Sequence, residues 1–465
     1  MLLPGVREHH ILPSFDAGRW LLFDVEKGVV LPLPEGIEEG LHPEKAGEEA
    51  GELYGMLKET LLPANEDAET DTAESAAEDA EQEPPHATHL SLDLAGSCNL
   101  RCRYCFESDL DSRHGKPDPA MLQSALRRFF EQLPPDAVAH IHFGSGEPLL
   151  GFSRLQEVVA ESMRLAGSRE VRFHLTTNGT LLNEEMALFL SAHPFHVKVS
   201  MDGPPEHQNA NRPKPHNAPS YDEAYAGLQK LLELMPERVT INSVLTAGQR
   251  LIDLWHWARE IGIRHLQVIK VGAPGGQEMQ LPGEMLHAYQ HDLQTIAKDT
   301  AQALAANRQP VIFQPLAKVV AAIATGRRNE RYCGAGGDYL GVDVKGDVWP
   351  CFHYIGLEEY RLGNIDNAWQ SPERQHYFNR HATPVDQRPV CSQCWARYLC
   401  GGGCYADAAI YGKDADSPFM HHCDFWRAEF EVGLALYEVL IRMGPQYVLA
   451  LMGIKDDELL ATVAG

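Results

Sequence analysis

The amino-acid sequence predicts an α/β fold built on a parallel sheet, flanked by a small N-terminal unit and a loop-rich C-terminal segment. Three observations lead to this prediction. Apolar strand patterns alternate with amphipathic helix patterns between residues 89 and 272. An acidic stretch lies upstream of this pattern, and seven cysteines gather downstream of residue 330. With 465 residues, the chain is long enough for two or three domains.

The N-terminal unit is expected over residues 1–63. Residues 19–33 alternate well enough for two short strands around a turn at residues 26–28, and residues 48–61 have helical spacing. A hairpin with a helix could be a small peptide-recognition module or a packing extension of the main domain. The pattern leaves both interpretations open.

An acidic linker is expected over residues 64–87. Residues 64–85 contain nine acidic residues and no basic residue, so they bury too little apolar surface to offset the entropy of ordering. The formal net charge of the whole chain is -25. This charge argues against nucleic acid as a partner, because binding to phosphates requires a basic face.

The central segment, residues 88–310, carries the repeating pattern of strands and helices. Strands are expected over residues 89–96, 137–144, 169–179, 196–203, 238–246 and 263–272, and helices over residues 118–134, 153–167, 183–193, 220–235 and 250–262. Six strands with five intervening helices imply parallel pairing with right-handed crossovers. The segment is therefore predicted to form a barrel or an open sheet.

Turn motifs directly follow the first four predicted strands. In chain order they read CNLRCRYC (98–105), GSGEP (144–148), TTNGT (176–180) and MDGPP (201–205). Ligands of parallel α/β folds lie at the carboxyl ends of the strands. We therefore expect the four motifs to meet at one site, although each residue type is also an ordinary turn residue.

The C-terminal segment, residues 311–465, has a different texture. Residues 339–351 predict a hairpin that turns at Lys345 and Gly346, cysteine-rich loops follow, and residues 423–443 predict a long helix. A segment of this size with so many loops would be marginally stable without metal sites.

The ten cysteines point to metal binding. The chain begins without a secretion signal and contains no apolar run of about eighteen residues, so we predict a cytoplasmic protein with no membrane partner. In a reducing compartment, ten thiols are not expected to form five structural disulfides.

Cys98, Cys102 and Cys105 supply three ligands within eight residues. A structural zinc site needs four ligands, and the nearest histidine is His114. An iron-sulfur cubane uses one ligand per iron, so three thiolates leave one iron free to bind another molecule.

The spacing Cys-x3-Cys-x2-Cys, with Tyr104 before the third cysteine, resembles the signature of radical S-adenosylmethionine (SAM) enzymes. The resemblance implies a partial (β/α)6 barrel and a 4Fe-4S cluster whose open iron chelates SAM. The GSGEP turn is similar to the Gly-Gly-Glu-Pro loop that hydrogen-bonds the SAM amino group, with Ser145 in place of a glycine. The other turns resemble loops that contact the SAM ribose and carboxylate, and residues 243–246 would lie near the adenine. The SAM contacts implied are Tyr104, Gly144, Ser145, Gly146, Glu147, Thr177, Asn178, Ser200, Asp202, Arg212 and Thr246.

The seven remaining cysteines resemble the pattern of the SPASM domain, which carries auxiliary 4Fe-4S clusters in peptide-modifying radical SAM enzymes. The resemblance implies one cluster closed by four thiolates and another held by three, so the chain would bind three 4Fe-4S clusters in all. The ligand sets would be Cys391, Cys394, Cys400 and Cys423 for the first, and Cys333, Cys351 and Cys404 for the second. Residues 391–404 alone would also suit a structural zinc site.

Three clusters need twelve ligands, and the chain has ten cysteines. One vacancy would be for SAM. The other vacancy, on the three-cysteine auxiliary cluster, would suit a substrate thiolate. Sulfatase-maturing relatives fill that position with a cysteine, and residues 324–332 contain none.

This arrangement resembles the thioether-forming peptide maturases, which include those for SCIFF peptides, for freyrasin-type links and for a quinohemoprotein amine dehydrogenase subunit. It implies a substrate peptide or small protein subunit containing cysteine, and an electron donor such as flavodoxin or ferredoxin. A formylglycine-generating sulfatase maturase, a carbon-carbon cross-linking maturase and a zinc-stapled binding protein remain alternatives. No catalytic residue beyond the clusters is predicted, and the carboxylates near the auxiliary site, Glu330, Asp338 and Asp343, are interpreted as turn or solvated groups.

Overall fold

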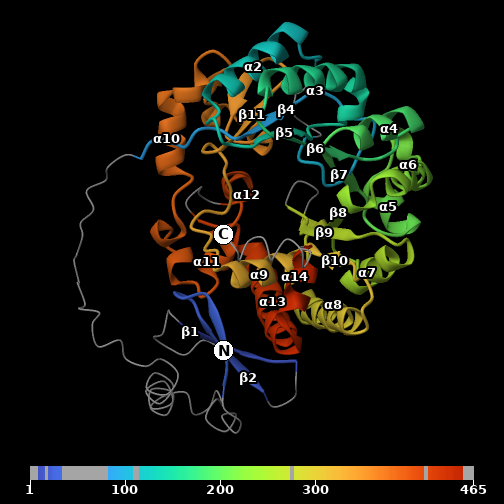
Figure 1. The fold of residues 1–465 in the computed structure, drawn as a ribbon, viewed down its shortest axis with the longest axis vertical. Coiled ribbons are helices and arrows are strands. Elements are labelled where there is room, and N and C mark those ends of the chain that lie inside the picture. Colours follow the sequence, from blue (N-terminus) through green and yellow to red (C-terminus); the bar gives the residue numbers. More distant parts are fainter. Residues whose placement is uncertain are drawn as a thin grey trace.

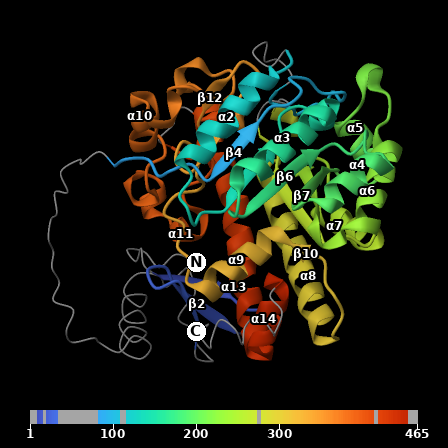
Figure 2. The same cartoon turned by 45° about the horizontal axis from the view of Figure 1, so that its top comes forward.

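The computed structural model describes residues 9–15, 19–33, 82–107, 115–272, 277–412 and 417–453. A ten-stranded sheet runs through its centre in the order β10-β9-β8-β7-β6-β5-β4-β11-β12-β13. The sheet curves round, and helices cover its outer side (Figures 1 and 2).

Six neighbouring strands of this sheet are parallel and follow chain order, as predicted. They are β4 (His89–Leu92), β5 (Ala139–Phe143), β6 (Val171–Thr177), β7 (Phe195–Ser200), β8 (Val239–Leu245) and β9 (His265–Lys270). Alternation along a strand decides which side chains face the helices. In β5, Ala139, Ile141 and Phe143 are buried in the main core, whereas His140 and His142 point to the inner side.

Helices connect these strands at the predicted places, namely α2 (Pro119–Gln132), α3 (Phe152–Ala166), α4 (Glu184–Ala192), α6 (Tyr221–Leu234) and α7 (Leu251–Glu260). Local chemistry sets where they begin. The carboxylate of Asp118 accepts the N–H of Ala120 at the start of α2, and Asn183 caps α4 in the same manner through Met186. Helices α5 (Pro205–Asn211), α8 (Leu286–Ala305) and α9 (Gln314–Thr325) were not predicted.

The predicted C-terminal hairpin continues the same sheet. Its strands, β11 (Tyr339–Val342) and β12 (Asp347–Trp349), flank a turn in which Gly346 has a positive φ of 87°. Strand β11 pairs in parallel with β4, and β12 pairs with β13 (Gly363–Asn364). At the other edge, β10 (Ile312–Phe313) pairs with β9. These additions cover the edges that the six central strands would otherwise expose.

The predicted long helix is present as α13 (Cys423–Met443), and it packs against α8, α9 and α14 (Pro445–Met452). A buried ion pair between Lys270 of β9 and Glu429 of α13, at 2.7 Å, joins this helix to the sheet. The cysteine-rich region between β13 and α13 contains the short helices α10 (Pro372–Arg380), α11 (Arg397–Cys400) and α12 (Tyr405–Tyr411). Among the helices of the described residues, none combines the length and the apolar character needed to cross a membrane.

The N-terminal segment contains the two predicted strands, β2 (Trp20–Asp24) and β3 (Val29–Pro32), and an additional strand β1 (His9–Pro13). This small sheet packs on the cysteine-rich region, where the His10 ring stacks on Trp395 at 3.8 Å. The predicted helix over residues 48–61 lies outside the described residues.

The end of the predicted acidic linker has fixed contacts with α10. The backbone N–H of Gln82 donates to the side-chain oxygen of Asn379, and the side-chain amide of Asn379 donates to the Gln82 carbonyl, both at 2.9 Å. Arg374 donates to the Pro85 carbonyl at 2.6 Å. Gln82, Glu83, Pro85 and His86 are exposed, as expected for a solvated linker, and the contacts of Gln82 and Pro85 hold the segment on α10. The rest of the linker, before Gln82, lies outside the described residues.

Candidate active site at the cysteine clusters

The loop after β4 brings Cys98, Cys102 and Cys105 to the carboxyl edge of the sheet. Its backbone N–H groups donate to the carbonyl oxygens of Asn211 at 2.9 Å and Pro213 at 2.7 Å, directly after α5. These two bonds wrap the loop around the space that its thiols face.

The three thiols share one electrostatic environment. The pKa of Cys98 is raised to about 11 and that of Cys102 to about 12, chiefly by burial and to a smaller extent by neighbouring thiolates. The Cys105 thiolate raises the pKa of both Cys98 and Cys102, and the Cys98 thiolate raises the pKa of Cys102. Without a cation the thiols would hold their protons at neutral pH, so a bound iron cluster is the group that would make them thiolates.

Glu147 ties together the loops after β4, β5 and β6. Its side chain is fully buried, and its carboxylate accepts hydrogen bonds from the Thr177 hydroxyl and the Asn178 N–H, both at 2.7 Å. Its own N–H donates to the Ser97 carbonyl at 2.9 Å. Burial raises the pKa of Glu147, and the hydrogen bonds oppose this rise. The GSGEP and TTNGT turns thus meet at the cysteine loop.

Two further contacts hold these turns on the loop. The side-chain amide of Asn178 donates to Asn99 at 2.8 Å and lies 3.8 Å from the sulfur of Cys98. The N–H of Gly146 donates to the carboxylate of Glu107 at 2.7 Å. Gly146 has a φ of +59°, and a Cβ at this position would lie 2.3 Å from the Ser97 carbonyl oxygen. Only glycine allows this approach.

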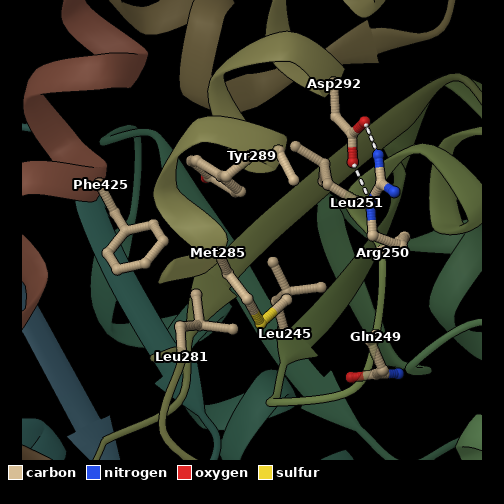
Figure 3. Close-up of a pocket in the computed structure, with 10 residues that line it drawn as sticks. Leu245, Gln249, Arg250, Leu251, Leu281, Met285, Tyr289, Asp292 and Phe425 are labelled. Atoms are coloured by element: carbon tan, nitrogen blue, oxygen red, sulfur yellow. Dashed lines mark hydrogen bonds and ion pairs between the residues drawn. The ribbon is translucent and has the colours of Figure 1, made fainter. Parts of the chain in front are cut away.

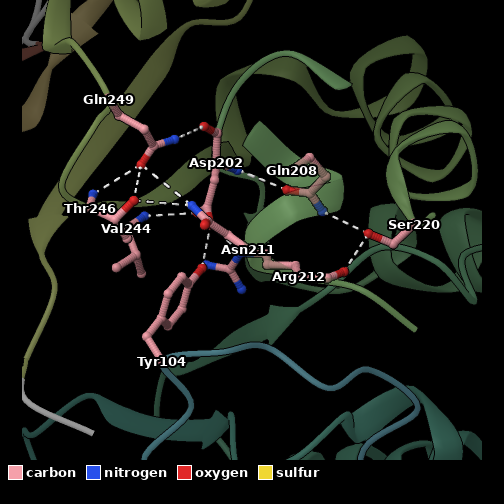
Figure 4. Close-up of polar contacts among 9 residues, drawn as sticks. All are labelled: Tyr104, Asp202, Gln208, Asn211, Arg212, Ser220, Val244, Thr246 and Gln249. Atoms are coloured by element: carbon pink, nitrogen blue, oxygen red, sulfur yellow. Dashed lines mark hydrogen bonds and ion pairs between the residues drawn. The ribbon is translucent and has the colours of Figure 1, made fainter. Parts of the chain in front are cut away.

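Asp202, after β7, is the centre of a second polar network (Figure 4). Its carboxylate accepts hydrogen bonds from the Tyr104 hydroxyl at 2.5 Å and the Val244 N–H at 3.0 Å, and it pairs with Arg212 at 3.1 Å. The Arg212 guanidinium also lies 5.2 Å from the Tyr104 ring. Asp202, with 1% of its surface exposed, therefore links the cysteine loop to the ends of β7 and β8.

Gln249 extends this network to the end of β8. Its side-chain carbonyl accepts hydrogen bonds from the N–H and the hydroxyl of Thr246, at 2.9 and 2.7 Å, and its amide donates to the Asp202 carbonyl at 3.1 Å. Ser200 and Ser145 are also buried at the same edge of the sheet. The residues expected to contact SAM thus come from consecutive strand ends, and Gln249 was not predicted among them.

Cys333, Cys351 and Cys404 form a second group. Burial raises the pKa of Cys333 to about 11. The pKa of Cys351 is raised to about 12, first by burial and then by Cys333. The pKa of Cys404 is raised well above its usual value by burial, then by Asp407, Cys333 and Cys351. Three sulfurs from separate segments of the chain therefore face one another.

The remaining four cysteines, Cys391, Cys394, Cys400 and Cys423, line a single cavity. Burial raises the pKa of Cys400 to about 12, and the other three thiolates contribute to this rise. Residues 401–403 are glycines with φ of 76°, 96° and 79°, which lets the chain turn from Cys400 back to Cys404. The fit to two separate metal groups therefore rests on the positions of the sulfurs as well as on their number.

The structure adds residues that the sequence did not indicate. The ligand atoms of His353, Cys404 and Asp407 all lie within 4.8 Å of one another. The His353 ring also contacts Phe106, next to the cysteine loop, with ring centroids 4.4 Å apart. Burial raises the pKa of Tyr411 above its usual value, and the charges of Asp407, Cys404 and Cys105 raise it further. Tyr411 is therefore near a cysteine of each three-cysteine group.

Asp343, one of the carboxylates near the auxiliary site, has a turn role, as expected. Its side chain accepts hydrogen bonds from the N–H groups of Lys345 at 2.8 Å and Asp347 at 3.0 Å, which shape the hairpin turn. A separate small pocket lies between α7, α8 and α13 (Figure 3). Its lining is apolar apart from Gln249 and the ion pair between Arg250 and Asp292, at 2.6 Å, and it contains no cysteine, so it reflects helix packing.

Comparisons with known families agree with this arrangement. The family model of the radical SAM superfamily matches residues 94–261, and that of the SPASM iron-sulfur cluster-binding domain matches residues 333–395. A cysteine-type anaerobic sulfatase-maturating enzyme from Clostridium perfringens is 26% identical over 363 residues, which are 75% of this chain and 96% of that protein. A serine-type enzyme from Klebsiella aerogenes is 25% identical over 72% of this chain and 84% of its own.

Solved structures share the fold. The structure of anSMEcpe with bound SAM has a TM-score of 0.64 at 22% identity, covering 79% of this chain and 100% of its own. Streptococcus suis SuiB with bound SAM has a TM-score of 0.53 at 16% identity, covering 88% of this chain and 97% of its own. SuiB bound to its precursor peptide SuiA gives a TM-score of 0.52 at 15% identity, covering 89% and 98% of the chains.

The donor groups of the chain suit the cofactors of these families. Its thiols converge in three places, and the turns at four strand ends surround the first of them. SAM and 4Fe-4S clusters are therefore its cofactors. The chain is a radical SAM enzyme that carries a SPASM iron-sulfur cluster-binding domain.

Proposed function

We propose that this enzyme forms thioether cross-links within a peptide or small protein subunit, joining a cysteine sulfur to a carbon of another residue such as Asp or Glu. Three clusters take part in this proposal. Their ligands are Cys98, Cys102 and Cys105 for the SAM-binding cluster, Cys333, Cys351 and Cys404 for an auxiliary cluster with one exchangeable position, and Cys391, Cys394, Cys400 and Cys423 for a closed auxiliary cluster.

When bound, the clusters and SAM supply a 5'-deoxyadenosyl radical that removes a substrate hydrogen atom, and an acceptor for the electron released when sulfur bonds to carbon. The protein residues position these groups. Glu147 fixes two SAM-facing turns, and Asp202 holds Tyr104 and Arg212 at the rim of the cysteine loop. The proposed SAM contacts are Tyr104, Gly144, Ser145, Gly146, Glu147, Thr177, Asn178, Ser200, Asp202, Arg212 and Thr246.

The observation that carries the proposal is a three-cysteine site close to the SAM-binding loop. The chain has ten cysteines, and four of them line the separate cavity. Cys333, Cys351 and Cys404 therefore have no fourth cysteine available. His353, whose ligand atom lies within 4.8 Å of the Cys404 sulfur, contacts Phe106, the residue after Cys105, with ring centroids 4.4 Å apart. A sulfur bound at the auxiliary site would therefore lie near the SAM-binding loop.

Formylglycine formation is the second candidate, because the curated relatives named above are sulfatase-maturating enzymes matched over most of their length. It would need no substrate sulfur on a cluster. Carbon-carbon cross-linking would likewise leave the substrate cysteine unbound, whereas the three-cysteine site supports a reaction that binds sulfur. A zinc-stapled binding protein does not agree with the family matches.

Anaerobic incubation with SAM, a reductant and a cysteine-containing peptide, followed by mass spectrometry, tests the proposal. A thioether removes two hydrogens from the peptide and leaves a cysteine that iodoacetamide no longer alkylates. Conversion of the cysteine to formylglycine would instead establish the second candidate. A cross-linked product whose cysteine is still alkylated would indicate a carbon-carbon link.

Two variants separate the clusters in that reaction. Cys98→Ala should abolish SAM cleavage, because it removes a ligand of the SAM-binding cluster. Cys404→Ala should leave cleavage measurable and abolish cross-linking. Loss of cross-linking without loss of cleavage is the result that assigns the three-cysteine site to the substrate. Equal loss of both activities in Cys404→Ala would argue against separate roles.

The remaining partners are also proposals. Strand β3 is an edge of the N-terminal sheet, so an extended leader segment of the substrate could add to it as a further strand. Deletion of residues 1–33 should then raise the KM for a leader-containing peptide more than that for its isolated core. A flavodoxin or ferredoxin would supply electrons, and a chain with ten cysteines suits a reducing cytoplasm.

A further inference from the structure

We infer that the Asp407 carboxylate is the fourth ligand of the Cys333, Cys351 and Cys404 cluster in the substrate-free enzyme, and that a substrate thiolate displaces it. The displacement deepens the proposed function and rests on it. The ligand assignment itself does not depend on which product the enzyme forms.

The position of Asp407 carries the assignment. Cys404 precedes the first residue of α12, and Asp407 follows three residues later, so both side chains lie on one side of the helix. Asp407 hydrogen-bonds Cys404, and its carboxylate lies within 4.8 Å of the sulfur. The carboxylate is therefore a donor group beside one of the three thiols that would hold this cluster.

The surroundings of Asp407 lack the cation that a partly buried carboxylate requires. In the described part of the chain, no lysine or arginine forms an ion pair with it. A carboxylate removed from water without a positive partner is unfavourable. A bound cluster would supply that positive partner at Cys404, three residues away.

His353 is the competing donor, because its ring nitrogen belongs to the same group of ligand atoms. Its ring is held by aromatic neighbours, since its centroid lies 4.4 Å from that of Phe106 and 4.4 Å from that of Phe352. A carboxylate also has the same charge as the thiolate that would displace it. The cluster would thus keep one overall charge whether Asp407 or a substrate sulfur is bound.

The same helix places the exchangeable ligand near the SAM-binding loop. His353, whose ligand atom lies within 4.8 Å of the Asp407 carboxylate, contacts Phe106, and Phe106 directly follows Cys105. The Asp407 carboxylate therefore lies close to the loop that would hold the radical source. In the exchange, the Asp407 carboxylate would give up its position to the substrate thiolate and would take up the proton that the thiol releases, so charge and proton count balance.

Electron paramagnetic resonance of the reduced auxiliary clusters tests this inference. The full-length protein carries Cys98→Ala, Cys102→Ala and Cys105→Ala, which removes the signal of the SAM-binding cluster. In this background Asp407→Ala should shift the g-values of one cluster while the iron content stays at about eight atoms, for two cubanes. Asp366→Ala is the control, because this exposed aspartate belongs to the same C-terminal segment and pairs with Arg128, at 3.9 Å, instead of a cysteine neighbour.

Titration with N-acetylcysteine amide, a small thiol, tests the exchange. Wild-type Asp407 should compete with the thiol, so Asp407→Ala should bind it at least several-fold more tightly. Asp407→Cys should close the site with a fourth thiolate and remove the response to thiol. Unchanged g-values and an unchanged thiol affinity in Asp407→Ala would overturn the inference, as would a nitrogen hyperfine coupling that only His353→Ala removes.

The outcomes distinguish this inference from the proposed function. If Asp407→Ala shifts the g-values but mass spectrometry finds no thioether, the ligand assignment is correct and the proposed product is wrong. If thioethers form and Asp407→Ala leaves the g-values unchanged, only the ligand assignment is wrong.

Discussion

The hydroxyl of Tyr104 donates a hydrogen bond of 2.5 Å to the carboxylate of Asp202. The two residues belong to the cysteine loop after β4 and to the end of β7, so one bond fixes the loop to the opposite part of the barrel. Arg212 stands beside both, which makes the pair part of a buried and charged unit. The geometry of the three cysteines in this loop therefore depends on strands that contribute no cysteine.

Tyr104→Phe should lower the free energy of unfolding by about 1–3 kcal/mol, because it removes a hydrogen bond from a buried carboxylate. Anaerobic urea denaturation of the reconstituted protein measures this change. Tyr225→Phe is the control, since Tyr225 stacks on Tyr221 and has no side-chain hydrogen bond within the described residues. Equal stability of the two variants would show that the Asp202 contact contributes nothing.

Arg212→Ala should be more damaging, at about 3–5 kcal/mol, because it leaves the Asp202 charge buried without its partner. The side chain of Asp202 is fully buried and that of Arg212 is 8% exposed. In the same denaturation assay, Arg164→Ala should have no measurable effect, because the ion pair of Arg164 with Glu161 lies at the surface. A loss confined to SAM affinity, with stability unchanged, would contradict the structural role of Arg212.

Glu429→Gln should also destabilise the protein by about 3–5 kcal/mol, because it removes the charge that compensates the buried ammonium of Lys270. The hydroxyl of Tyr289 also donates to Glu429, so the variant disturbs the contact of α8 with α13. Glu223→Gln, which affects the more exposed pair with Lys214, is the control and should cost at most about 1 kcal/mol. Similar losses in both variants would count against a special role for the buried pair.

Histidine rings on the inner side of the sheet should make stability depend on pH. The pKa of His140 is lowered to about 4, first by burial and then by the neighbouring His89. The pKa of His174 is lowered to about 3, first by burial and then by His140. Nitrogen atoms of these two rings lie 2.9 Å apart. Because both folded-state pKa values lie below 6.5, the unfolded chain binds more protons as the pH falls below that value. The free energy of unfolding should therefore decrease on acidification from about pH 7 to about pH 5.

The comparison of wild type with the double variant His140→Gln and His174→Gln isolates this effect. Its melting temperature should fall less between about pH 7 and about pH 5 than that of the wild type. Glu170, Arg172, His196 and Lys198 also act on these rings, and they are unchanged in the comparison. Parallel pH profiles would mean that acid loss of the clusters, which is common to both proteins, accounts for the whole decrease.

Local patterns predicted much of this fold, because each central strand and its following helix bury one apolar face. The alternation in residues 139–143 and the glycine turn at Gly346 both have direct structural counterparts. The pairing of β11 with β4 was not predictable in this way. Its residues are far apart in the chain, and no periodicity indicates which edge a hairpin will join.

For the same reason, some residues of the candidate site could be predicted from the sequence and others could not. The cysteines and the turn motifs could be found from spacing, since their chemistry is carried by neighbouring residues. Gln249 could not, because a glutamine in a turn looks ordinary until folding places it beside Asp202. Asp407 is only three residues from Cys404, but it looks like an ordinary helical aspartate until folding brings His353 to the same place. Long-range contacts decide which polar residues stand out at the site.

Gly146→Ala should separate the GSGEP turn from the cysteine loop. The added methyl group would lie 2.3 Å from the Ser97 carbonyl oxygen, in a backbone conformation with a φ of +59° that disfavours alanine. Backbone at Ser97 must then move, and with it the Glu147 N–H bond that joins the two loops. We expect SAM affinity to fall by at least tenfold, measured by anaerobic equilibrium dialysis.

Gly144→Ala is the control within the same turn, because its nearest neighbour, Thr176, would lie at an ordinary 3.8 Å from the added Cβ. Comparable affinities of the two variants would show that the close approach at Ser97 does not position SAM.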